Sequence, residues 1–145
     1  MNPGKRADGR LLVSIVDDDA SMRSSTRRLL GTFGFRADAF ASAQAFLDSG
    51  RLQDTACLIL DVRMPGMDGL ELQRWLARNH RRLPIIFVTA HASAEEEARA
   101  MQAGALAFLR KPVSPQDLLS ALRAAEVASR RGGPEDAEES RRPHP

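Results

Sequence analysis

Hydrophobic residues along this chain fall into short apolar runs that alternate with longer amphipathic stretches. Four of the runs are almost continuously apolar, which is typical of β-strands covered on both faces. These four runs cover residues 11–16, 57–60, 85–88 and 105–109. A weaker fifth run covers residues 35–40, and we expect it to lie at an edge of the sheet.

Between these runs, apolar residues recur at the spacing of three and four that is typical of amphipathic helices. The clearest example begins at Met22 and ends at Phe33, where Gly34 supplies a stop signal. Further helices are expected near residues 43–49, 72–76, 94–103 and 118–125. Strands that alternate with helices predict an α/β fold, in which a doubly wound parallel sheet with right-handed crossovers carries helices on both faces.

The two ends of the chain differ in composition from the part between them. Residues 130–145 include eight charged residues, three prolines and two glycines, but no Val, Ile, Leu, Met or aromatic residue. Such a segment cannot bury enough apolar surface to offset the entropy lost on ordering it. We therefore expect residues 1–9 and 131–145 to be disordered and residues 10–130 to form one folded domain.

Charge is balanced within the predicted domain. Residues 11–129 hold fourteen basic and fourteen acidic side chains, and this neutrality argues against direct binding of nucleic acid. The single cysteine, Cys57, allows no internal disulfide and no multi-thiolate zinc site, which fits a reducing compartment. No apolar run approaches the ~18 residues of a membrane-spanning helix, and the amino end lacks the apolar core of a signal peptide. We therefore expect a cytoplasmic location.

Chemically active side chains follow four of the five predicted strands. The carboxyl ends of parallel strands meet at one edge of a sheet, where ligands bind in open α/β folds. Carboxylates gathered there repel one another unless they take up a proton or share a cation, and Mg²⁺ prefers oxygen ligands. The sequence therefore predicts a magnesium site at this edge. The residues concerned are Asp17, Asp18 and Asp19 after the first strand, Asp61 after the third, Thr89 after the fourth and Lys111 after the fifth.

Each of these residues also has a simpler interpretation. Asp19 stands directly before a helix and is expected to cap it, and capping or a solvated turn would equally explain Asp17 and Asp18. A lone Asp61 could simply begin a turn, and Thr89 could simply form a hydrogen bond at the end of its strand. Lys111 is one of only two lysines in a chain with 21 basic residues, which suggests that a compact point charge is required there. The peptide bond between Lys111 and Pro112 could be cis or trans.

Five motifs occur in an order and spacing that together identify a family. With these motifs, residues 12–128 resemble the receiver domain of bacterial two-component response regulators, nearest to the branch that includes FixJ-type regulators. This resemblance implies a flavodoxin-like fold with strand order 2-1-3-4-5 and five helices. The motifs are VDDD at 16–19, LDVRMPGMDG at 60–69, VTAH at 88–91, AGALAF at 103–108 and RKPV at 110–113.

The resemblance implies that Asp61 accepts a phosphoryl group, as a carboxylate nucleophile that forms an aspartyl phosphate. The donor would be the phosphohistidine of a sensor histidine kinase or of a phosphotransfer protein. Thr89 and Lys111 would each contact a phosphoryl oxygen.

The same resemblance implies a Mg²⁺ cofactor that offsets the charge of the phosphoryl group. Asp18 and Asp61 would bind the ion directly, together with the backbone carbonyl of Arg63, and Asp17 would bind it through water.

A switch is implied as well, in which Thr89 moves toward the new phosphoryl group and the Phe108 side chain rotates. Ordinary core packing is the alternative role for Phe108. The surface formed by the fourth helix, the fifth strand and the fifth helix would then bind a downstream protein target and support a homodimer. Arg63 and His91 border the route of attacking water in this family, so we expect them to tune the phosphate lifetime, although a solvated loop residue is the simpler interpretation of His91.

Several functions of the protein are compatible with these motifs. We favour a stand-alone single-domain regulator that is not an enzyme, beyond assisting its own phosphorylation and dephosphorylation. One alternative is the N-terminal receiver fragment of a FixJ-type DNA-binding transcription regulator. Another is an aspartyl-phosphate hydrolase, although the second acid of such enzymes usually stands two residues after the nucleophile, where this chain has Arg63. A third alternative is a degenerate receiver domain that serves only as a scaffold for partner proteins.

Overall fold

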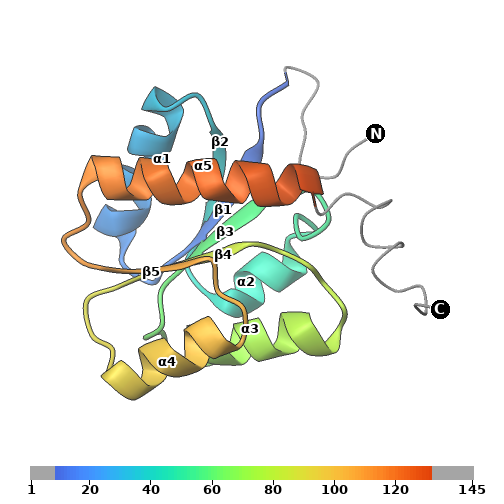
Figure 1. Ribbon diagram of the computed structural model, residues 1–145, viewed down its shortest axis with the longest axis vertical. Coiled ribbons are helices and arrows are strands. Elements are labelled where there is room, and N and C mark those ends of the chain that lie inside the picture. The colour runs from blue at the N-terminus through green and yellow to red at the C-terminus, as the bar shows by residue number, and fades with distance from the viewer. Residues whose placement is uncertain (1–8, 132–145) are drawn as a thin grey trace.

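The apolar runs form the strands of one five-stranded parallel sheet (Figure 1). In the computed structural model, which describes residues 9–131, neighbouring strands lie in the order β2-β1-β3-β4-β5 and all pairs are parallel. This result confirms the predicted fold class and strand order. The strands are β1 (Leu12–Val16), β2 (Arg36–Phe40), β3 (Cys57–Leu60), β4 (Ile85–Thr89) and β5 (Ala107–Arg110).

Five helices alternate with the strands, as predicted. The last helix extends to Arg131, one residue beyond the predicted end of the domain. Residues 1–8 and 132–145, which make up most of the two ends predicted to be disordered, lie outside the described residues. No helix in the described part is both long and apolar enough to cross a membrane. The helices are α1 (Ala20–Thr32), α2 (Ala43–Asp48), α3 (Gly69–Arg78), α4 (Ala94–Gln102) and α5 (Pro115–Arg131).

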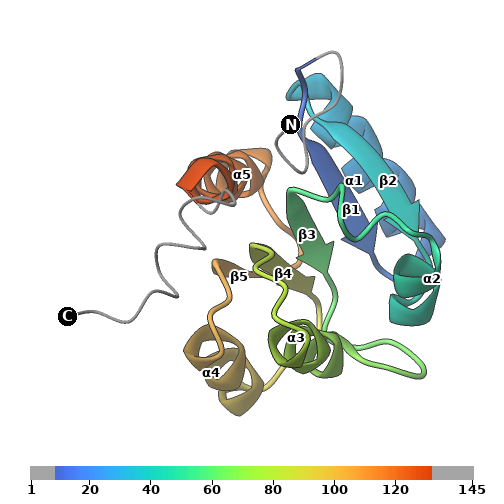
Figure 2. The same ribbon diagram turned by 90° about the vertical axis from the view of Figure 1, so that its right-hand side faces the viewer.

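The sheet is covered on both faces, by α1 and α5 on one side and by α2, α3 and α4 on the other (Figure 2). Successive residues of a strand point to opposite faces. Ile15 accordingly packs with the α1 and α5 layer, whereas Val16 packs with the other three helices. Cys57 lies in the first of these layers as a free thiol, and burial raises its pKa to about 12.

The two outer strands are only partly buried. This confirms the edge position expected for residues 35–40, and it places residues 105–109 at the opposite edge, in agreement with the strand order that the resemblance implies. Phe108 and Leu109 do pack against opposite layers, yet β5 has β4 as its single neighbour, so its open side is exposed to solvent. Apolar patterning detects contact with helices, and it does not detect a missing strand neighbour.

Helix ends are defined by polar side chains beside the predicted site. Asp19 caps α1 as expected, and its carboxylate accepts hydrogen bonds from two backbone N–H groups of the first turn. Gly34 follows α1 with φ +90°, a conformation that glycine adopts without strain. Capping boxes begin α3 and α4, and their D-x-x-E and S-x-x-E sequences were visible signals that the sequence analysis did not use.

Gly69 begins α3 directly against the backbone of Asp61. A Cβ atom at position 69 would overlap the carbonyl oxygen of Asp61 and would lie 3.1 Å from Cε1 of Phe87. The Gly69 N–H also donates a hydrogen bond to the carbonyl of Val62 at 3.0 Å. The absence of a side chain therefore lets α3 pack closely beneath the end of β3.

We predict that Gly69→Ala lowers the free energy of unfolding by about 1–3 kcal/mol, because backbone must shift to accommodate the methyl group. Urea unfolding followed by circular dichroism measures this change. Gly31→Ala is the matched control, since a Cβ at this exposed position of α1 meets nothing within 4 Å. The control should gain up to ~1 kcal/mol from helix propensity. Equal effects of the two substitutions would show that the close approach at Gly69 carries no free-energy cost.

Candidate functional site

Three aspartates converge at the carboxyl ends of β1 and β3. Val16 pairs with Leu60 in the parallel register, so the residues that follow these two strands emerge side by side. Carboxylate oxygens of Asp17, Asp18 and Asp61 all lie within 4.8 Å of one another. Asp17 and Asp61 are buried, and Asp18 is exposed. The structure therefore brings together the three carboxylates that the sequence indicated.

Short local hydrogen bonds orient the two buried carboxylates. Oδ1 of Asp17 accepts from the Asp19 N–H at 2.9 Å, and Oδ1 of Asp61 accepts from the Arg63 N–H at 3.1 Å. The second oxygen of each group, Oδ2, contacts Lys111 instead. In each carboxylate, Oδ1 is thus held by the backbone of the following turn, and Oδ2 faces the shared site.

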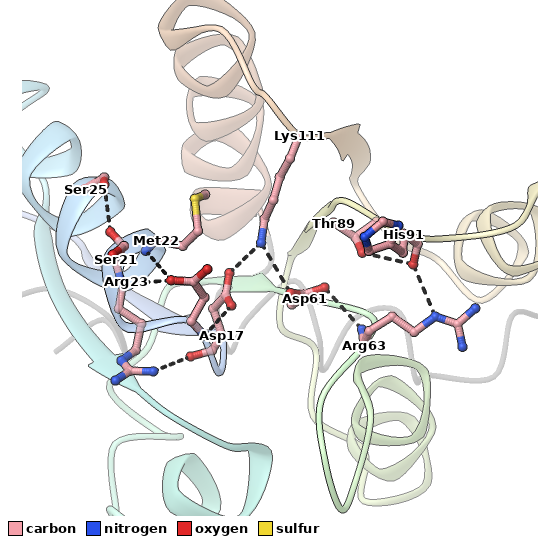
Figure 3. A network of polar contacts seen from close by, with 11 residues as sticks. Asp17, Ser21, Met22, Arg23, Ser25, Asp61, Arg63, Thr89, His91 and Lys111 are labelled. Atoms are coloured by element: carbon pink, nitrogen blue, oxygen red, sulfur yellow. Dashed lines mark hydrogen bonds and ion pairs between the residues drawn. The ribbon is translucent and has the colours of Figure 1, made fainter.

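Lys111 reaches between the two buried aspartates (Figure 3). Its Nζ lies 2.9 Å from Oδ2 of Asp17 and 3.3 Å from Oδ2 of Asp61. The Lys111 N–H donates to the carbonyl of Thr89 at 2.9 Å, which anchors the lysine backbone beside β4. The peptide bond to Pro112, left open by the sequence, is cis. The predicted point charge contacts both buried carboxylates of the acidic group.

The pKa values of Asp17 and Lys111 reflect this crowding. Burial raises the pKa of Asp17, and hydrogen bonds from Asp19 and Lys111 only partly compensate. For Lys111, burial alone would lower the pKa, but the carboxylates of Asp17 and Asp61 outweigh it and raise the pKa overall. The ammonium therefore stays charged, yet one positive charge faces three carboxyl groups. The remaining negative charge favours a bound cation.

The chemistry of these ligands suits a hard divalent ion. All three candidate ligand atoms are carboxylate oxygens, and Mg²⁺ binds through a few carboxylates while it keeps several waters. Exposed Asp18 leaves one side of the group open to solvent. The residues present therefore fit Mg²⁺, and the ligand role of the Arg63 carbonyl stays a prediction.

Arg23 is a contributor that the sequence analysis missed. This residue lies on α1, and its Nη1 donates to the backbone carbonyl of Asp17 at 2.8 Å. The sequence did contain a signal for this role, since Arg23 is a basic residue one turn after Asp19, the residue expected to cap the helix. Arg23 thus fixes the turn that carries the first two carboxylates, and it adds positive charge beside them.

Thr89 lies next to the acidic group with its hydroxyl turned toward the β4–α4 loop, residues 90–93. The side chain is completely buried, and its Oγ1 donates to the carbonyl of His91 at 3.4 Å. Figure 3 shows Thr89 and His91 on the far side of Asp61 from Asp17. A contact between Thr89 and a phosphoryl group on Asp61 would require the hydroxyl to leave the His91 carbonyl.

Arg63 and His91, the pair expected to border the route of water, contact each other through one backbone group. Arg63 Nε donates to the His91 carbonyl at 3.2 Å, and Nη2 lies 2.7 Å from Oε1 of Glu96 on α4. The guanidinium therefore points away from Asp61, toward the loop and helix. The His91 side chain is exposed.

Phe108 packs into the core on one side and meets a cation on the other. Its ring centroid lies 5.7 Å from that of Phe87, and the Arg110 guanidinium carbon lies 5.5 Å from the Phe108 centroid. Both roles considered for Phe108, core packing and switching, fit this position. Arg110 is a second residue that the sequence analysis did not assign to the site.

Comparisons with known proteins agree with this geometry. The sequence pattern of the response regulator receiver domain matches residues 13–123. Nodulation protein W of Bradyrhizobium diazoefficiens is 43% identical over 125 residues, which cover 86% of this chain and 55% of that protein. Transcriptional regulatory protein FixJ of the same organism is 39% identical over 122 residues, or 81% of this chain and 60% of that protein. The chain spans about half the length of the curated relatives it matches.

The similarity extends to three-dimensional structure. The crystal structure of FixJ-N aligns with a TM-score of 0.73 and 34% identity, over 80% of this chain and 93% of that one. The segment that matches the family pattern, residues 13–123, includes the three converging aspartates and all of the five strands except Leu12. The chain therefore belongs to the family of response regulator receiver domains, with FixJ among its relatives.

Proposed function

We propose that this domain accepts a phosphoryl group on Asp61 from the phosphohistidine of a sensor histidine kinase or phosphotransfer protein, in a Mg²⁺-dependent reaction. The observation that carries the proposal is the convergence of Asp17, Asp18 and Asp61 within 4.8 Å, with the Lys111 ammonium on Asp61. In the reaction, a P–O bond to the Asp61 carboxylate forms as the P–N bond breaks. The imidazole leaves with the electron pair of that bond.

Mg²⁺ would be held by Asp18, Asp61 and the Arg63 backbone carbonyl, with Asp17 acting through water. When bound, the ion would offset the charge of the phosphoryl group and help align it with the carboxylate. The Arg63 N–H holds Oδ1 of Asp61 and thereby restricts rotation of the nucleophile.

Two further side chains would receive the phosphoryl oxygens. Lys111 lies 3.3 Å from Asp61 and needs only a short movement to pair with a new anionic oxygen. Thr89 would turn its hydroxyl from the His91 carbonyl to another phosphoryl oxygen. Because Phe108 lies beside the same strand end, this movement would release its ring and change the surface of α4, β5 and α5.

The altered surface would bind a downstream protein target, and phosphorylation would favour a homodimer through it. We favour a cytoplasmic regulator that acts through such protein contacts. A second candidate is the receiver part of a DNA-binding transcription regulator, which is supported by relatives named as transcriptional regulatory proteins and by the share of their length that this chain spans. An aspartyl-phosphate hydrolase has less support, since position 63 is an arginine engaged with Glu96 rather than a second acid.

We predict that acetyl phosphate and Mg²⁺ add one phosphoryl group, about 80 Da, to the intact protein. Asp61→Asn should prevent this addition, because the amide is a far weaker nucleophile, and chelation of Mg²⁺ should prevent it in the wild type. Mass spectrometry of the whole protein measures the adduct. Asp54→Asn is the control, since Asp54 is an exposed aspartate in the loop before β3. An adduct on Asp61→Asn equal to that of the control would contradict the proposal.

We predict that Arg63→Ala and His91→Ala each shorten the lifetime of the aspartyl phosphate, because loss of the Arg63 contact or of the His91 side chain would loosen the β4–α4 loop beside Asp61 and open the approach of water. The expected factor is about two to ten, equivalent to at most ~1.4 kcal/mol of barrier. Radiolabelled or mass-resolved decay after donor removal measures the rate. Arg74→Ala, at an exposed position on α3, is the matched control. If both variants lose the phosphoryl group at the same rate as Arg74→Ala, neither side chain controls the lifetime of the aspartyl phosphate.

A further inference from the structure

The β4–α4 loop is held from one side by Arg63, which extends from the loop after β3. The guanidinium bonds the backbone carbonyl of His91 at 3.2 Å through Nε and the carboxylate of Glu96 at 2.7 Å through Nη2. Glu96 also accepts a hydrogen bond from the Ser93 N–H at 2.9 Å, as part of the capping box of α4. Arg63 thus joins the loop to the first turn of the helix.

Arg110 holds the next loop residue in the same way from β5. Its Nη1 donates to the Ala92 carbonyl at 2.8 Å, and its Nη2 lies 2.8 Å from Oε1 of Glu97. The same guanidinium lies over the ring of Phe108, where a cation is attracted to the aromatic face. One side chain therefore contacts the loop, α4 and the aromatic residue together.

The two arginines contact consecutive carbonyls and consecutive glutamates on opposite sides of one loop. That loop begins at Thr89, whose hydroxyl donates to the same His91 carbonyl that Arg63 bonds. A hydroxyl has a single hydrogen to donate, so it cannot hold His91 and a phosphoryl oxygen at once. Because the loop continues directly from Thr89, movement of this residue toward Asp61 would shift residues 91 and 92 relative to both arginines.

We propose that Arg110, with Arg63 as its counterpart, is a positioning residue that holds the β4–α4 loop and Phe108 in the unphosphorylated arrangement and so opposes the switch. This inference rests on the proposed phosphorylation of Asp61. A half-exposed ion pair alone contributes little. Each guanidinium here also bonds a backbone carbonyl, and Arg110 faces a ring, so loss of the contacts shifts a two-state equilibrium by several-fold.

The test measures binding of beryllofluoride, a phosphoryl mimic, in the presence of Mg²⁺, by NMR titration. Arg110→Ala should bind it about three- to tenfold more tightly than wild type, since less free energy is spent on releasing the loop. Glu97→Gln, which keeps the side-chain shape and removes one ion pair, should bind about twofold more tightly.

Glu95→Gln is the matched control for net charge. Glu95 lies in the same first turn of α4 and is exposed, so its substitution removes an equal charge from the same turn. Its affinity for beryllofluoride should equal that of wild type. Unchanged or weaker binding by both Arg110→Ala and Glu97→Gln would overturn the inference, because damage to the fold weakens binding and cannot strengthen it.

Amide hydrogen exchange without the mimic separates this inference from the proposed function. Residues 90–93 should exchange faster in Arg110→Ala than in Glu95→Gln, which tests the arginine contacts without any phosphoryl group. Faster exchange without a gain in affinity would assign Arg110 a purely structural role and overturn the inference. Failure of wild type and Glu95→Gln to bind the mimic at all, despite the expected exchange pattern, would instead overturn the phosphorylation proposal on which it rests.

Discussion

Repulsion among three neighbouring carboxylates is the constraint on which this domain depends. Parallel pairing of β1 with β3 places Asp17, Asp18 and Asp61 within 4.8 Å of one another, and two of them are buried. Isolated carboxylates in such a place would take up protons or destabilise the fold. Lys111 offsets part of this charge from a position 94 residues after Asp17, and the remaining negative charge favours a bound cation.

The surrounding fold serves to hold these charges in place. The three central strands are buried along their whole length, so the turns that carry the aspartates begin from a rigid base. Asp19 caps α1, Arg23 holds the carbonyl of Asp17, and Gly69 lets α3 pack against Asp61. On the other side of Asp61, the β4–α4 loop is held mainly by exposed side chains. The site thus combines an acidic half held from buried strands with a loop held by ion pairs at the surface.

Much of this arrangement follows from patterns that are local in sequence. Apolar runs indicate the strands, and parallel topology then implies that Asp17, Asp18, Asp61 and Lys111 meet at one edge. The edge position of β5 does not follow from its apolar pattern, and it was predicted only through the strand order that the resemblance implies. The directions of Arg63, Thr89 and Arg110 did not follow either. Each is set by a partner from another element, such as the His91 carbonyl or Glu97, and helical or strand periodicity carries no information about such partners.

The most direct test of the acidic group is thermal unfolding measured over a range of Mg²⁺ concentrations. If the carboxylates repel one another and share a cation, wild-type protein gains stability with Mg²⁺, by about 2.7 kcal/mol at a hundredfold excess over Kd. Asp18→Asn, which removes one of the mutually repelling charges, should be more stable than wild type without Mg²⁺ and gain less from its addition. Two results would contradict the account: a melting temperature of the wild type that does not change with Mg²⁺, or one that rises equally in the wild type and in Asp18→Asn.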